Sequence, residues 1–110
     1  MGTTFLYSRL PELQSTPISF SGSGDNEIVA AVSGKRVLIH RLFIVCGGAT
    51  SITFKRGSTS LSGALPMVSG GGITFDITGE PWFTTGLAEN FVIGSSSAVQ
   101  VSGCCYYDTK

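Results

Sequence analysis

Few side chains in this sequence have the types and spacing that acid–base or metal chemistry requires. There is one histidine, His40, so no histidine cluster can hold a metal, and no Cys-x-x-Cys spacing indicates zinc. His40 lies in the most apolar run of the chain, and the sequence marks no nucleophile or orienting acid that a general base would need. Glu80 and Glu89 fall in expected turns, which fix no distance between the two carboxylates. We therefore expect no catalytic residue, no metal and no cofactor.

The glycine-rich run and the cysteines have structural interpretations as well. The Ser-Gly-Gly-Gly run at 69–72 lacks the lysine and following helix of a phosphate-binding loop, so we expect a hairpin loop in which glycine supplies a positive φ. Cys104 and Cys105 are adjacent on an expected strand and point to opposite faces. An odd number of cysteines without an export signal favours reduced, buried thiols. A disulfide from Cys46 to one of the other two stays open, because it requires neighbouring strands.

The composition is that of a protein with little surface charge. Charged residues make up 13% of the 110 residues, against about 25% in ordinary domains. Seven basic and seven acidic residues cancel, so we expect no binding to nucleic acid or to a membrane surface. The first residues do not resemble a signal peptide, and no apolar run approaches the ~20 residues that cross a bilayer. These totals favour one domain, made in a cytoplasm and buried against a partner.

The elements that would position any site are short strands. Turn residues separate apolar runs, and no capped amphipathic period of ten residues predicts a helix. The expected strands are 18–20, 27–33, 37–46, 51–56, 61–68, 73–77, 91–94 and 98–107. About eight such strands predict an all-β fold, a single-domain antiparallel β-sandwich that is jelly-roll-like. The order of the strands cannot be read from one sequence.

The stretch 36–56 is the one around which the chain is organised. Residues 37–46 are apolar on both faces, whereas residues 51–56 alternate between apolar and polar. With a Gly-Gly-Ala-Thr turn between them, the two runs predict a hairpin. Strict alternation assigns the apolar residues of the first run to two faces. These faces are Val37, Ile39, Phe43 and Val45 on one side, and Leu38, Leu42, Ile44 and Cys46 on the other. We expect one face to meet the second sheet and the other a neighbouring subunit.

Residues 1–17 are expected to form an extended N-terminal arm, and residues 18–110 the β-sandwich. The arm has scattered apolar side chains, and ordering it costs roughly 1–2 kcal/mol per residue that contacts must offset. We favour an arm that lies on a partner over an idle leader, and expect deletion of residues 1–16 to leave the fold intact. In the loop Pro81-Trp82-Phe83 the aromatics either plug the core or anchor a contact. The expected partner-interface residues are Phe5, Leu6, Tyr7, Arg9, Leu10, His40, Arg41, Trp82 and Phe83, with a purely structural His40 as the alternative.

A series of loosely spaced features runs from about residue 34 to 107. They are Gly34-Lys35-Arg36-Val37-Leu38, Ile52-Thr53-Phe54-Lys55-Arg56-Gly57-Ser58, Leu61-Ser62-Gly63, Gly79-Glu80-Pro81-Trp82-Phe83-Thr84-Thr85-Gly86, Val99-Gln100-Val101-Ser102-Gly103 and Tyr106-Tyr107. This pattern of turns and strands resembles the small capsid decoration, or cement, proteins of tailed bacteriophages that have β-sandwich folds.

The resemblance implies a structural virion protein rather than an enzyme. Such a protein would be made in the host bacterial cytoplasm and would bind the outer surface of an icosahedral capsid. There it would self-associate as a dimer or trimer and reinforce contacts between major capsid protein subunits. An alternative is a ligand- or carbohydrate-binding β-sandwich module of a phage tail, fibre or neck, which the aromatic loop at Trp82 favours.

Overall fold

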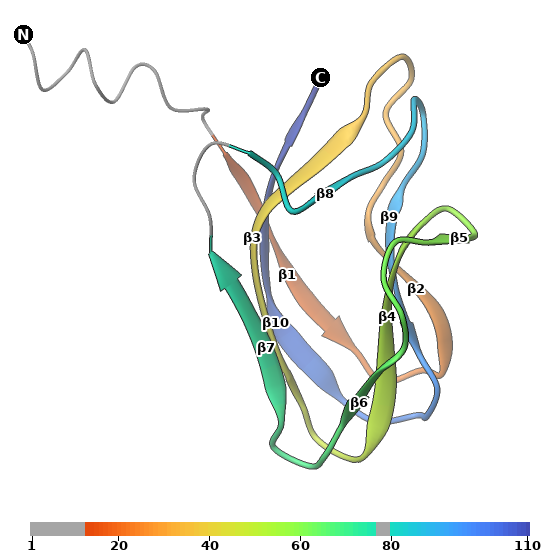
Figure 1. Ribbon diagram of the computed structural model, residues 1–110, viewed down its shortest axis with the longest axis vertical. Helices are drawn as coiled ribbons and strands as arrows, with labels where there is room; N and C mark the ends of the chain where they lie inside the picture. The colour runs from red at the N-terminus through yellow and green to blue at the C-terminus, as the bar shows by residue number, and fades with distance from the viewer. Residues whose placement is uncertain (1–12, 77–79) are drawn as a thin grey trace, which may run out of the picture.

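The computed structural model describes residues 13–76 and 80–110. Over these ranges the chain forms ten β-strands and no helix, an all-β fold as the sequence predicts, although with more strands than the eight expected. The strands make two antiparallel sheets that pack face to face as a single-domain β-sandwich, seen as two layers in Figure 1.

The first sheet, sheet A, is built around the longest strand, β3 (Val37–Cys46). β10 (Val101–Thr109) pairs with one edge of β3, and β1 (Gln14–Phe20) pairs with the far edge of β10. β7 (Gly72–Asp76) and β8 (Phe83–Thr84) both pair with the other edge of β3, at different positions along it.

The second sheet, sheet B, has β9 (Phe91–Ser95) between β2 (Gly24–Val29) and β4 (Thr50–Arg56). Two short strands, β5 (Thr59–Ser60) and β6 (Leu65–Met67), share the outer edge of β4. β6 includes Pro66, and an edge position suits a residue that has no backbone N–H to donate.

The strand orders are β1-β10-β3-β7 and β2-β9-β4-β5, with β8 and β6 as second pieces at two of the edges. The chain passes between the sheets from β1 to β2, β2 to β3, β3 to β4, β6 to β7, β8 to β9 and β9 to β10. This is the eight-position arrangement of a jelly roll, so the predicted sandwich is confirmed. There are ten strands rather than eight because two edge positions are each split into two pieces.

The predicted hairpin over residues 36–56 is wrong, because β3 and β4 belong to different sheets. The turn between them carries the chain across the sandwich and lies against the start of β10. The Gly47 N–H donates to the Gln100 carbonyl at 2.7 Å, and a Cβ at Gly48 would lie 2.8 Å from Val99 Cγ1. The glycines therefore allow a close backbone approach at a corner. The predicted hairpin loop at 69–72 is also wrong, because this run leads from β6 in one sheet to β7 in the other, although Gly70 has the expected positive φ, +81°.

A β-bulge at His40 decides which residues of β3 face the core. β3 and β10 pair in regular register from Cys46 to Arg41, which lies opposite Tyr106, and the next pair is Ile39 with Tyr107. His40 is therefore the extra residue, and it reverses the alternation of side chains between the two halves of the strand.

Because of this bulge, the two faces that strict alternation predicts for β3 are wrong. The inward set is Val37, Ile39, Leu42, Ile44 and Cys46, all at most 2% exposed. The outward set includes Arg41, Phe43 and Val45. Both halves of β3 thus contribute to one core, and Phe43 and Val45 lie on the opposite face from Val37 and Ile39.

Four phenylalanines form the aromatic part of the core. The Phe54 ring lies 5.9 Å from Phe75, 5.1 Å from Phe83 and 6.2 Å from Phe91, measured between ring centroids. They come from both sheets, so their contacts hold the sheets together. Phe83 is therefore a partly buried residue of the Pro81-Trp82-Phe83 loop that packs against the core.

The sandwich begins earlier than the predicted boundary at residues 17 and 18. β1 starts at Gln14, and residues 14–17 pair with Tyr107 to Cys104 of β10. Deletion of residues 1–16 would remove the first three residues of this strand, so the expectation that it leaves the fold intact is not supported. Residues 1–12 of the expected arm lie outside the described residues.

We predict that Phe54→Ala lowers the free energy of unfolding by about 3–5 kcal/mol, because it removes the ring that three other phenylalanines contact. Urea denaturation followed by fluorescence or circular dichroism measures the change. Thr53→Ala is the matched control, since Thr53 faces outward from the same strand, and we expect its effect to stay within about 0.5 kcal/mol. Equal effects of the two substitutions would contradict the assigned faces of β4.

Candidate interaction surface

The outward face of sheet A, called here the sheet A face, is made by outward side chains of β1, β10, β3 and β7. Its centre is Phe43, which lies opposite Cys104 on β10 and Thr74 on β7. Cys104 in turn lies opposite Pro17 on β1. A large aromatic side chain therefore stands in a row of smaller ones.

The next row toward the end of β3 is centred on Val45. Its neighbours are Ser102 on β10 and Gly72 on β7. A Cβ at Gly72 would collide with the Ile44 carbonyl oxygen, so a side chain cannot occupy that position without moving the backbone. The Phe43 and Val45 side chains are 46% and 51% exposed. Two neighbouring apolar side chains in the middle of a sheet are thus left open to solvent.

On the other side of Phe43 the face carries an ion pair. Arg41 Nε lies 2.8 Å from Asp76 Oδ1, and Arg41 Nη2 donates to Asp76 Oδ2 at 3.3 Å. The guanidinium also stacks over the Tyr106 ring, 5.2 Å from its centroid. Both charged side chains are about half exposed, so the pair contributes at most about 1 kcal/mol to stability. Its main effect is to hold Arg41 in place beside a hollow of about 150 Å³ that Phe43, Arg41 and Tyr106 help to line.

Of the sequence-predicted interface residues, the four that the structure describes are not brought together into one surface. Arg41 is exposed on the sheet A face, but His40 is only 3% exposed, and its Nδ1 has no hydrogen-bond partner among residues 13–76 and 80–110. Trp82 is 51% exposed and packs on Phe75 at 4.8 Å between ring centroids. Phe83 is partly buried and packs against the core cluster. The remaining five, Phe5, Leu6, Tyr7, Arg9 and Leu10, lie outside the described residues.

Sequence reasoning missed the contributions of Phe43, Val45, Asp76 and Tyr106 to this surface. The signal for Phe43 and Val45 was the doubly apolar strand. Strict alternation without the bulge assigned them to the same face as Val37 and Ile39, whereas the bulge puts them on the opposite, outward face. No sequence signal could link Arg41 to Asp76 and Tyr106, because their proximity follows from the order and register of β10, β3 and β7.

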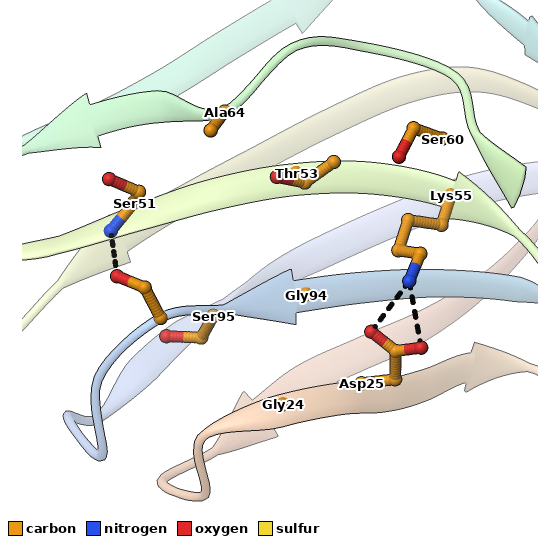
Figure 2. A pocket seen from close by; sticks show the side chains of 10 residues that line it. Gly24, Asp25, Ser51, Thr53, Lys55, Ser60, Ala64, Gly94 and Ser95 are labelled. Carbon is orange, nitrogen blue, oxygen red and sulfur yellow. Dashed lines mark hydrogen bonds and ion pairs between the residues drawn. The ribbon is translucent and has the colours of Figure 1, made fainter. Parts of the chain in front are cut away.

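Sheet B presents a different, polar outward face. A hollow of about 250 Å³ lies over β9, where Gly94 leaves the strand without a side chain (Figure 2). On one side Lys55 Nζ donates to both oxygens of Asp25, at 3.0 and 2.9 Å, and the Lys55 side chain is only 18% exposed. The remaining lining residues are small, namely Gly24, Ser51, Thr53, Ser60, Ala64, Ser95 and Ser96. Hydroxyls and an ion pair suit a small polar ligand, and Trp82 is not among the lining residues.

The two glutamates considered above as a carboxylate pair have different surroundings. Glu89 accepts a hydrogen bond from the Gly86 N–H at 2.6 Å and pairs with Arg56 at 3.1 Å, so it holds the turn before β9. Glu80 is exposed. Over residues 13–76 and 80–110 no group of three or more His, Cys, Asp or Glu side chains could hold a metal ion. The same part of the chain has no helix long and apolar enough to cross a membrane.

The three cysteines are free thiols. β3 and β10 are neighbours, but Cys46 lies opposite Val101, four residues along the strand from Cys105. That offset is about 13 Å, beyond the roughly 7 Å between Cα atoms that a disulfide spans. Burial raises the pKa of the Cys46 thiol, and burial together with the neighbouring Cys104 raises the pKa of Cys105 to about 12. These two thiols act as small apolar side chains of the core.

Comparisons of the chain with protein-family models, with curated proteins and with solved structures found no match. A function must therefore be inferred from the chemistry of these two faces and from the pattern of residues 34–107.

We predict that in dilute native protein at pH 8 a thiol reagent modifies Cys104 well before Cys46 and Cys105. The raised pKa keeps Cys105 protonated at this pH, and both Cys46 and Cys105 are buried. Mass spectrometry of the labelled protein identifies the sites, and Cys104→Ser should remove the fast phase. Rapid modification of Cys105 in folded protein would contradict its burial.

Proposed function

We propose that this protein is a structural virion component that binds the outer surface of an icosahedral phage capsid and reinforces contacts between major capsid protein subunits. The observation that carries the proposal is the sheet A face, where Phe43 and Val45 are about half exposed at the centre of a sheet. Contiguous apolar surface on a soluble protein marks a site of interaction, because burying it gains roughly 25 cal/mol per Å².

The charge distribution supports a structural role. Charged residues are depleted at the centres of protein interfaces, and here the central side chains of the sheet A face are apolar or small. Arg41 and Asp76 form an ion pair beside Phe43, and the other charged outward residue, Asp108 on β10, lies opposite Leu38, away from the centre of the face. The seven basic and seven acidic residues also balance, which allows many copies to crowd on one lattice without strong mutual repulsion.

The fold and the resemblance of residues 34–107 to capsid decoration proteins support the same proposal. Jelly rolls occur in viral capsid proteins, in lectins and in cupins, so the fold alone does not choose among these functions. A cupin-type metal site needs several histidines, whereas this sequence has one. On a capsid, one oligomer that contacts several subunits gains affinity from each contact, so weak individual contacts suffice.

We predict that the protein co-sediments with bare, expanded capsids. The amount of the protein in the pellet of sedimented shells is measured over a range of protein concentrations. Deletion of residues 1–12 should weaken attachment about tenfold or more, because the scattered apolar side chains of this segment favour an arm that lies on a partner. This deletion retains all of β1. Failure of the full chain to sediment with any shell would argue against the capsid role.

A second candidate is a ligand- or carbohydrate-binding module of a phage tail, fibre or neck, which the hollow on sheet B favours. For this alternative we predict that the protein binds sugars on a glycan array and that Gly94→Val abolishes this binding. A Cβ at position 94 would lie 3.3 Å from Asp25 Oδ1, so the valine side chain would fill the floor of the hollow. Trp82→Ala is the companion variant, because an exposed indole is the other possible sugar platform. Loss of glycan binding only with Trp82→Ala would place the sugar site at the exposed indole rather than on sheet B. An array on which no glycan binds the protein would contradict this candidate function.

A further inference from the structure

We infer that the outer edge of β7 is a docking site for an extended segment of a capsid subunit, which pairs with Thr74 and Asp76 as an added strand. The inference deepens the proposed function and rests on it, because the capsid subunit supplies the segment. The site lies at the backbone edge of sheet A, beside the exposed apolar side chains of the sheet A face.

The register of β7 directs part of its backbone away from the sheet. The Cys46 N–H donates to the Gly71 carbonyl at 2.8 Å, in the same register as the β3–β7 pairs. Alternate residues of β7, counted from Gly71, therefore bond to β3, and the residues between them point their N–H and C=O groups outward. Thr74 and Asp76 are two of these residues, and both are exposed. Within residues 13–76 and 80–110, β7 pairs with no strand on that side.

The other edges that the described strands form are protected against a further strand. β1 contains Pro17, which has no N–H to donate. β2 carries Asp25 and Glu27, and its register shifts after Glu27. The edge of β4 has only β5 and β6, which are two and three residues long, and β6 contains Pro66. Proline, charge, bulges and short length are the devices that keep edge strands from pairing. β7 has five residues in regular register and no proline.

The hollow of about 150 Å³ on the sheet A face lies beside this edge and is lined by Thr74, Phe43 and Tyr106 among others. A cavity of about this volume holds a benzene-sized group. The Thr74 side chain is short, so a long apolar side chain of the added strand can pass over it to the Phe43 ring. The one charged residue of β7, Asp76, is held in its ion pair with Arg41 on β3, so its carboxylate is drawn toward the sheet rather than across the edge.

An extended peptide is the occupant that these features select. Unpaired N–H and C=O groups two residues apart, at a spacing of roughly 6.6–6.8 Å, match the backbone of another strand. In such strand addition the main-chain hydrogen bonds give affinity, and a pocket for an alternate side chain gives specificity. The segment should therefore carry a long apolar side chain opposite Thr74. So few contacts bind weakly, and the many sites of a shell compensate for that.

The first test compares Thr74→Pro with the native full chain, and Thr74→Val is the matched control. The proline removes an N–H that points to the partner and none that bonds to β3, so the ladder between β7 and β3 is retained. The valine keeps the N–H and suits a strand. We expect Thr74→Pro to sediment with bare, expanded capsids at least about tenfold more weakly, and Thr74→Val to sediment as the native chain does. Unchanged thermal unfolding checks that each variant folds.

Amide hydrogen exchange of the native chain, resolved to single residues, is the second measurement and needs no variant. In free protein the Thr74 and Asp76 amides should exchange much faster than those of Ile73 and Phe75, which bond to β3. On the shell, the Thr74 and Asp76 amides should become protected.

If these two amides exchange on the shell as fast as in free protein, or are already protected in free protein, the inference is overturned. Attachment of Thr74→Pro with native affinity would overturn it as well. In each of these cases the native chain still attaches, and the capsid role survives. A native chain that attaches to no shell would contradict the capsid role and the inference together.

Discussion

The extra residue at His40 is the constraint on which the rest of this structure depends. A regular ten-residue strand would send Val37 and Ile39 to one face and Leu42 and Ile44 to the other, and a single core could not bury both pairs. The bulge reverses the alternation once, so that both halves of β3 contribute to one core. It does so at the place where β7 ends its pairing with β3 and β8 begins. The edge position beside β3 is therefore divided between β7 and β8 at the point where the alternation of β3 side chains reverses.

The same reversal sets the chemistry of the outer surface. Because Leu42, Ile44 and Cys46 fill the core, the intervening Phe43 and Val45 must face outward, beside Arg41. Sheet B has no such bulge in β4, and its outward face carries Ser51, Thr53 and Lys55 in regular alternation. One sandwich thus presents an apolar face and a polar face. The apolar one is the surface that we propose a protein partner covers.

The sequence predicted the kind of fold better than its connections. The absence of a helical period and the regular spacing of apolar runs predicted the sandwich. The predicted limits of β3 agreed with the structure. Both features depend on local alternation and on turn residues. The hairpin at 36–56 failed because a Gly-Gly turn is equally compatible with a corner between sheets. The start of β1 at Gln14 was missed because its hydrogen-bond partners on β10 lie about ninety residues away. The ion pair of Arg41 with Asp76 depends on the same long-range register. The doubly apolar strand did indicate apolar residues outside the core, although the predicted division of its residues between the two faces was wrong.

The measurement that tests the central claim most directly is hydroxyl-radical footprinting of the side chains of the sheet A face. Reactivity would be compared between dilute free protein and protein attached to shells, with Leu87 as an exposed reference outside that face. If the sheet A face is a buried interface on the particle, Phe43 and Tyr106 lose reactivity on attachment while Leu87 does not. Equal reactivity of Phe43 in the two states would show that the face stays open to solvent, and would contradict the claim that its exposed apolar residues are there to be covered by protein.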